Sequence, residues 1–197
     1  MADDVVVYYA LQSPWTYLGW RRFLDIAKDS GKTPVFRPVR SIDLFAASGG
    51  QPLAKRPIQR QAYRMMELKR WREALGQPLT LEPAFFPVDE RLAALMVIAH
   101  GEQGGDVGAF SLAMLQAVWV EERNLADEPT LRDLARAQGA DADALLALAR
   151  TQPIADRYDA HTQAAIDDGV FGVPTFKVGD ELFWGQDRLD LLARALC

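Results

Sequence analysis

Residues 8–20 read YYALQSPWTYLGW, and this stretch passes from a strand through a tight turn into a helix. The run that leads into it, residues 5–11, is β-branched and aromatic, which is typical of a buried strand. Pro14 suits the first turn of a helix, and Ser13 before it suits the N-cap. We expect this helix to end at about Gly31. The stretch therefore predicts a strand that is followed directly by a helix.

A second strand is predicted at residues 33–39, TPVFRPV, where two prolines make it irregular or place it at an edge. From about Ser41 the pattern changes to helical periodicity with turns between the helices, and we expect no strand in this region. Caps, prolines and glycines predict helices over about 57–75, 90–100, 106–123, 129–138, 141–151 and 153–168.

Strand character returns after Gly169. Residues 170–178, VFGVPTFKV, predict a strand, Gly179-Asp180 predicts a tight hairpin, and residues 181–184, ELFW, predict its second strand. Asp187 is then a candidate N-cap of a last amphipathic helix. This part of the chain therefore predicts strand, hairpin, strand, helix.

The two ends together predict an α/β protein with a thioredoxin-like fold, in which β-α-β is followed by β-β-α. A right-handed crossover allows the first two strands to lie parallel, and the hairpin adds an antiparallel pair. We expect a discontinuous thioredoxin-like domain, residues 1–40 and 155–197, which is interrupted by an all-helical insertion, residues 41–154.

The composition is that of an ordinary globular protein. Of 197 residues, 49% are hydrophobic and 25% charged, and the apolar runs are too short to cross a membrane. The net charge of −5 argues against a general nucleic-acid binder. The basic and aromatic stretch 60–72, RQAYRMMELKRWR, has helical period and contains a glutamate, so a solvated helix face is favoured over an RNA site. Acidic residues stand where a secretory signal would be basic, which favours a cytoplasmic protein.

The only cysteine is Cys197, which we expect to be a terminal thiol without a task. A single cysteine excludes an intramolecular disulfide and a C-x-x-C motif, so the chain has no redox pair of its own. His100 and His161 lack ligand spacing, and no metal site is predicted.

Three motifs carry a family resemblance. They are YYALQSPWTYL at 8–18, GVFGVPTF at 169–176 and FWGQDRLDLL at 183–192. In this combination the sequence resembles the 2-hydroxychromene-2-carboxylate isomerases, which are close to kappa-class glutathione transferases and more distant from DsbA-type oxidoreductases. Phe86-Pro87 is also family-like. A looser match is formed by Pro57, Arg60, Tyr63, Glu67 and Arg70, where the family usually has lysine in place of Arg60 and aspartate in place of Glu67.

The resemblance implies that Ser13 and Thr16 occupy the two cysteine positions of C-x-x-C, and that the missing thiol comes from bound glutathione. A free thiol is only a few per cent ionised at neutral pH. The start of a helix favours an anion, and the Ser13 hydroxyl adds one hydrogen bond to it. Ser13 would thus stabilise a thiolate without being the nucleophile. Taken alone, Ser13-Pro14 is an ordinary helix start.

The resemblance also implies where glutathione binds. The Val173-Pro174 bond is expected to be cis, with the Val173 backbone free to pair with the cysteinyl part of glutathione. The alternative is an ordinary proline at the start of a strand. The γ-glutamyl group is expected at Trp184, Gly185, Gln186 and Asp187, although Asp187 could also be a plain helix cap.

The implied substrate is a small aromatic carboxylate, which calls for an apolar pocket with a cation. Candidates by position are Arg40, Lys55, Arg60, Tyr63 and Phe86, with Phe85 beside it; each could instead be a surface charge or a core ring. The asparagines common in the family near residues 48–57 and 85–91 are missing, which leaves the identity of the substrate open.

The sequence therefore predicts a glutathione-dependent isomerase that interconverts 2-hydroxychromene-2-carboxylate and trans-o-hydroxybenzylidenepyruvate, or a related aromatic keto acid, and that forms a homodimer as is usual in the family. One alternative is a kappa-like glutathione transferase or peroxidase. The other is a non-catalytic thioredoxin-like module that binds a peptide or partner protein at Val173-Pro174.

Overall fold

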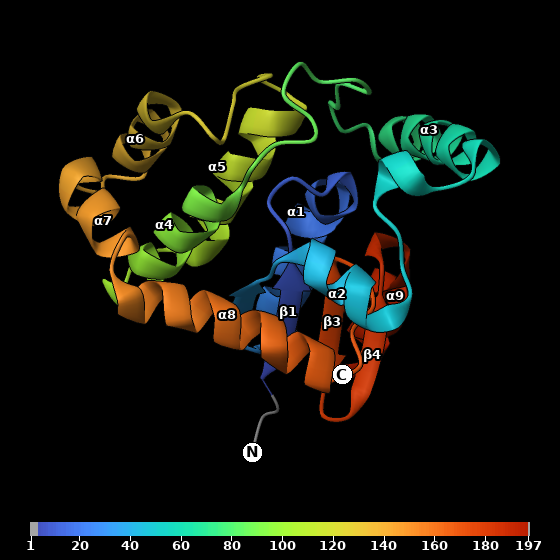
Figure 1. Cartoon of the computed structure of the whole chain (residues 1–197). Coiled ribbons are helices and arrows are strands. Elements are labelled where there is room, and N and C mark those ends of the chain that lie inside the picture. The colour runs from blue at the N-terminus through green and yellow to red at the C-terminus, as the bar shows by residue number, and fades with distance from the viewer. Residues whose placement is uncertain (1–3, 197) are drawn as a thin grey trace.

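A four-stranded sheet lies at the centre of the computed structural model, which describes residues 4–196 (Figure 1). The strand order is β2-β1-β3-β4, with β1 parallel to β2 and antiparallel to β3, and β3 antiparallel to β4. Val7 of β1 lies opposite Phe36 of β2 and Phe176 of β3. The predicted thioredoxin-like order of elements is confirmed. The strands are β1 (Val5–Tyr9), β2 (Pro34–Pro38), β3 (Thr175–Val178) and β4 (Glu181–Trp184).

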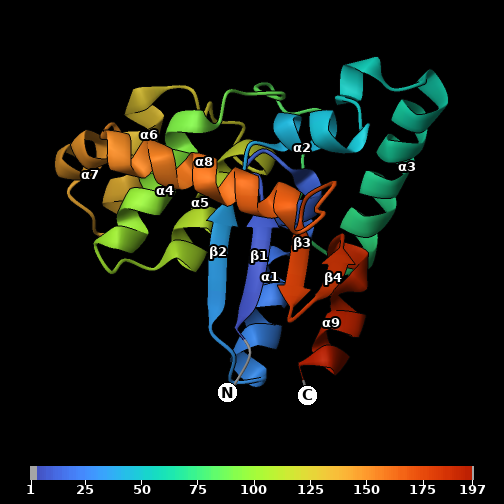
Figure 2. The same cartoon turned by 60° about the horizontal axis from the view of Figure 1, so that its bottom comes forward.

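Helices cover both faces of the sheet. Figure 2 shows α8 (Gln152–Asp167) crossing in front of the strands, with α1 (Pro14–Asp29) and α9 (Leu189–Ala195) behind them. Side chains alternate along β1, so that Val7 and Tyr9 pack with the α1 core, whereas Tyr8 packs with the α8 side. The alternation of side chains along an apolar strand is therefore the physical origin of the two-sided core.

The region between β2 and β3 consists of helices joined by turns and loops, without a strand, as predicted. Pro129 and Pro153 lie in the first turns of α6 and α8, and Asp106, Asp127 and Asp141 cap α5, α6 and α7 through their carboxylates. The helices are α2 (Ser41–Ser48), the short 3-10 helix η1 (Leu53–Lys55), α3 (Ile58–Leu75), α4 (Arg91–Glu102), α5 (Val107–Trp119), α6 (Glu128–Ala137), α7 (Ala142–Ala149) and α8 (Gln152–Asp167).

Three predicted boundaries differ. Helix α5 ends at Trp119 rather than near residue 123, because the chain reverses there through Glu122, whose φ is 53°. Strand β3 begins only at Thr175, after the Val173-Pro174 bond, whose proline lacks an amide hydrogen for the ladder. The last helix begins at Leu189, behind a 3-10 turn, so Asp187 is not its N-cap, and that prediction is wrong.

The sheet and the helical region share one core. Trp20 of α1 packs on Tyr9 with ring centroids 4.6 Å apart and donates its indole N–H to the Gly108 carbonyl at 2.9 Å. The Tyr9 and Ser111 hydroxyls are hydrogen bonded at 2.8 Å. These contacts fix α5 against α1. The division of the chain at residues 40 and 155 remains our proposal.

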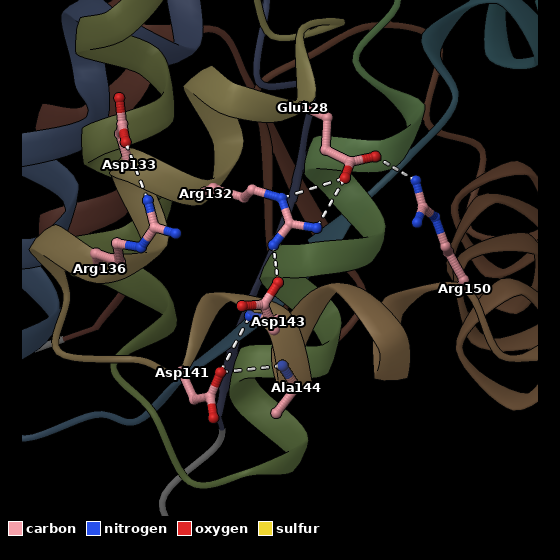
Figure 3. Close-up of polar contacts among 8 residues, drawn as sticks. All are labelled: Glu128, Arg132, Asp133, Arg136, Asp141, Asp143, Ala144 and Arg150. Carbon is pink, nitrogen blue, oxygen red and sulfur yellow. Dashed lines mark hydrogen bonds and ion pairs between the residues drawn. The ribbon is translucent and has the colours of Figure 1, made fainter.

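Ion pairs hold the outer helices together. Figure 3 shows Arg132 between Glu128 and Asp143, while Glu128 also pairs with Arg150. Asp141 accepts from the amides of Asp143 and Ala144 at 3.0 and 3.1 Å, which caps α7. No helix in the part of the chain that the structure describes is long and apolar enough to cross a membrane. Cys197 lies outside the described residues.

Candidate active site

Ser13 lies where β1 has ended and α1 begins. Its backbone is extended, with φ −79° and ψ 121°, and its Oγ accepts from the Thr16 amide at 3.2 Å, so the predicted N-cap is present. The hydroxyl proton is not used in this contact and remains available to a ligand. Ser13 is 8% exposed, and that opening faces a large cavity.

The cavity has a volume of about 1470 Å³ and is bordered by both parts of the chain. One wall comes from the sheet side, with Ser13, Val173 and the turn at residues 184–187. The other comes from η1, α3 and the segment around Phe86. Of the predicted substrate residues, those that line the cavity are Lys55, Arg60, Tyr63 and Phe86.

The Val173-Pro174 peptide bond is cis, as expected. Val173 lines the cavity together with Ser13, and it precedes the β-ladder, which begins at Thr175. The Pro174 carbonyl accepts from the Gly185 amide at 2.9 Å. Pro174 itself is not among the lining residues, and its carbonyl ties the turn at 184–187 to the start of β3. Phe86-Pro87 is a second cis bond beside the same cavity.

The turn at residues 184–187 is fixed from α1. Arg22 donates to the backbone carbonyl of Gln186 at 3.0 Å and also contacts the side-chain Oε1 of Gln186. Because arginine is only a donor, this contact sets the amide orientation and leaves the Nε2 donor of Gln186 to other partners. At Gly19 an added Cβ would lie 2.7 Å from the Cβ of Gln186, so α1 and this turn approach closely.

Three more residues complete the turn. Trp184 is half exposed and packs edge to face with Phe171, with centroids 4.7 Å apart. Gly185 has a φ of +97°, which favours glycine, and the Asp187 Oδ1 lies 2.5 Å from where its Cβ would be. Asp187 pairs with Arg188 at 2.9 Å and borders the cavity.

Arg40 is placed differently from the other substrate candidates. Its guanidinium pairs with Asp43 at 2.6 Å and with Asp159 at 3.0 Å, and lies over the Tyr158 ring. The hydrogen bond with Asp43 holds its pKa above the ordinary value. Arg40 is not among the cavity residues, and its position links α2 with α8.

Sequence reasoning missed Arg22, Arg56 and Arg64. Arg56 and Arg64 line the cavity beside Arg60. Burial, together with the nearby charge of Arg56, lowers the pKa of Arg64 to about 10. The period of α3 could have shown this, because residues 60, 64, 67 and 71 share one face, and that face lines the cavity. The stretch at 60–72 is therefore not a purely solvated face.

Comparison with known proteins places this architecture in a family. The family model of the DSBA-like thioredoxin domain matches residues 4–197. The chain belongs to the DsbA-like thioredoxin family. A 2-hydroxychromene-2-carboxylate isomerase of Sphingobium xenophagum is 31% identical over 193 residues, which make up 98% of this chain and 97% of that protein. The isomerase of the same name from Pseudomonas putida is 29% identical over 96% of this chain and 92% of its own length.

Solved structures agree with this DsbA-like assignment. A 2-hydroxychromene-2-carboxylate isomerase structure matches with a TM-score of 0.85 and 29% identity, covering 98% of this chain and 93% of that one. The cytosolic disulfide reductase DsbM from Pseudomonas aeruginosa, solved with GSH, matches with a TM-score of 0.68 and 21% identity over 98% of each chain, which shows the fold. The resemblance to the isomerases is confirmed.

In this DsbA-like chain a buried carboxylate holds the turn before Ser13. Glu90 accepts from the Gln12 amide at 2.8 Å and from the Gln12 side-chain amide at 3.0 Å. The Gln12 side-chain oxygen in turn accepts from the Val88 amide at 3.2 Å. Burial raises the pKa of Glu90 to about 7, against the opposing effect of the Gln12 hydrogen bonds. Glu90 thus connects the start of α4 to the residue next to Ser13.

This burial predicts a pH-dependent stability. In the folded protein Glu90 keeps its proton up to about pH 7, but its pKa is 4.5 in the unfolded chain. The unfolded state therefore binds fewer protons between these values, and the free energy of unfolding falls as the pH rises from about 4.5 to 7. Relative to Glu90→Gln, the wild type should lose about 3 kcal/mol across this window. Urea unfolding at pH 5 and pH 7.5 measures it, and parallel profiles for the two proteins would contradict it.

Proposed function

We propose that this DsbA-like protein is a glutathione-dependent isomerase that interconverts 2-hydroxychromene-2-carboxylate and trans-o-hydroxybenzylidenepyruvate, or a related aromatic keto acid. The observation that carries the proposal is the relative of that name, 31% identical over 98% of this chain. The resemblance includes the motif around Ser13, and the described cavity is large enough for a tripeptide beside an aromatic acid.

The residues present fit glutathione. The Ser13 hydroxyl has a free proton at the positive end of α1, Val173 has backbone outside the β-ladder, and the turn at 184–187 offers the amide of Gln186 and the carboxylate of Asp187. The DsbM structure solved with GSH shows that a neighbour of the same fold takes this ligand. Asp187 would meet the ammonium of the γ-glutamyl group and the Gln186 amide its carboxylate.

Bound glutathione would supply a thiolate, a nucleophile that can add and leave again, which is the chemistry that rotation about a conjugated double bond requires. The residues of the chain would hold glutathione and the substrate and polarise the sulfur. Ser13 donates to the sulfur and keeps it ionised, Val173 aligns the peptide, and the aromatic wall around Phe86 orients the ring of the substrate. Glutathione is regenerated in each cycle.

The proposal is tested by following the absorbance of the interconversion with and without glutathione. We expect conversion only when glutathione is present, with no loss of free thiol over many turnovers. S-methylglutathione is the matched control, because it keeps the tripeptide but has no thiolate, and it should inhibit. Stoichiometric consumption of glutathione would indicate a transferase or peroxidase instead, and failure of calorimetry to detect glutathione binding would favour a peptide-binding module.

The cytoplasmic location and the homodimer remain part of this proposal. Support for a dimer comes from apolar side chains left exposed on α3, since Ile58 is 70% and Met66 49% exposed. Sedimentation at micromolar concentration decides between monomer and dimer.

A further inference from the structure

Four basic side chains from η1 and α3 border the cavity without a carboxylate partner. Lys55, Arg56, Arg60 and Arg64 all line it, and none of them forms an ion pair within residues 4–196. On the outer helices, by contrast, Arg132 and Arg150 share the carboxylates of Figure 3. The whole chain carries a net charge of −5, so acidic groups are plentiful. Within the described residues these four cations are therefore unpaired, whereas Arg188 and Glu67, which also line the cavity, are paired with Asp187 and Arg70.

Two of these guanidinium groups lie on aromatic rings. The Cζ of Arg64 is 5.3 Å from the centroid of Phe86, and that of Arg56 is 5.5 Å from the centroid of Phe45. Phe86 also packs against Trp119, with ring centroids 4.9 Å apart. A guanidinium that lies over a ring directs its N–H groups sideways, in the plane that suits a carboxylate.

Arg64 is the more buried of the pair and remains a cation at neutral pH, because its lowered pKa is still about 10. Its only hydrogen bond among the described side chains is a weak contact to the sulfur of Met65 at 3.7 Å. Burying an unpaired charge is unfavourable, and so is placing it near Arg56. An anionic ligand in the cavity removes both costs.

We propose that Arg64, with Arg56 beside it, binds the carboxylate of the aromatic substrate, and that Phe86 fixes the plane of this guanidinium. The inference rests on the proposed function. Arg64 is not one of the substrate residues that the family resemblance suggested. Arg64 thereby makes the enzyme selective for aryl acids over uncharged aromatic electrophiles. Ser13 lies on the opposite wall of the same cavity, so the acid group and the reacting carbon have separate contacts.

The test is direct binding of trans-cinnamate and of trans-cinnamamide, measured by calorimetry on the full chain. Cinnamate and its amide share one shape and differ in charge. In Arg64→Met we expect the Kd of cinnamate to rise about 10- to 100-fold, which is the loss of a charge-assisted pair of hydrogen bonds, with no change for the amide. Lys69→Met removes an exposed cation from the same helix and should bind cinnamate as the wild type does.

Equal affinity of cinnamate for wild type and Arg64→Met would overturn the inference, and so would a loss confined to glutathione binding in that variant. If Arg64→Met does not fold, Arg64→Lys replaces it, and we expect a smaller loss because a lysine keeps the positive charge and lacks only the planar fork. The outcome is independent of catalysis. If the wild type does not catalyse the isomerisation but Arg64→Met still weakens cinnamate binding, the proposed function is refuted and the carboxylate site at Arg64 is supported.

Discussion

A Ser13→Ala variant should isomerise about 10- to 100-fold more slowly than the wild type at saturating glutathione. The change removes one charge-assisted hydrogen bond to the thiolate, and such bonds contribute about 1.5–3 kcal/mol. Lowering a thiol pKa from 8.5 by about 1.5 units takes roughly 2 kcal/mol, so this one contact accounts for most of the ionisation. The pH profile of kcat should move toward higher pH in the variant, which a purely structural role of Ser13 would not cause.

Thr16→Val is the matched control for the Ser13→Ala variant. The Thr16 hydroxyl is buried and finds no hydrogen-bond partner within the described residues, and Thr16 is not among the residues that line the cavity. The variant keeps the shape of the side chain and the amide that donates to Ser13, and its turnover should stay unchanged. Both variants should remain folded, since losing the Ser13 cap costs about 1 kcal/mol. Unchanged turnover in Ser13→Ala would remove Ser13 from the mechanism.

An Arg22→Met variant should raise the Kd of glutathione about tenfold or more while leaving kcat at saturating glutathione close to wild type. Arg22 donates to two acceptors of Gln186, and without it the amide of Gln186 is free to turn. Binding falls because the turn at 184–187 must then be ordered by the ligand itself. Calorimetry gives the Kd, and steady-state rates give the split between KM and kcat.

The neighbouring residue provides the comparison for this variant. Arg21 is exposed on the same helix, and Arg21→Met removes the same charge without touching Gln186. Its affinity for glutathione should match the wild type. If both substitutions weaken binding equally, the effect is one of general charge, and the positioning role of Arg22 is wrong.

Most of the fold could be predicted from local signals. Ser13, Pro14 and Gly31 bound α1, and Gly179-Asp180 marks the β3-β4 hairpin, because caps and tight turns depend on a few neighbouring residues. The boundaries that differed depend on backbone conformation at single residues. Strand β3 starts late because Pro174 has no amide hydrogen for the ladder, and α5 ends early because the chain turns at Glu122.

The parts of the candidate site that lie in family motifs could be predicted from the sequence. The parts that depend on contacts between residues distant along the chain could not. Arg22 and Gln186 are 164 positions apart, and Gln12 and Glu90 are 78 apart, so neither contact has a sequence signature. Arg40 was a candidate because it follows β2, but Asp43 and Asp159 engage it. Arg64 shares a helix face with Arg60, which the helical period could have shown, but its contact with the Phe86 ring has no sequence signature.

The sheet order has a consequence for how the protein is made. β1 forms at the start of synthesis, but its partner β3 contributes Phe176 opposite Val7 only after the whole helical region has left the ribosome. Contacts so distant along the chain carry a high closure entropy and slow folding. Until residues 175–187 arrive, one edge of β1 stays unpaired, and the nascent chain lacks the turn at 184–187, which lies on the same wall of the cavity as Ser13. Chaperone protection should therefore matter more during translation than after it.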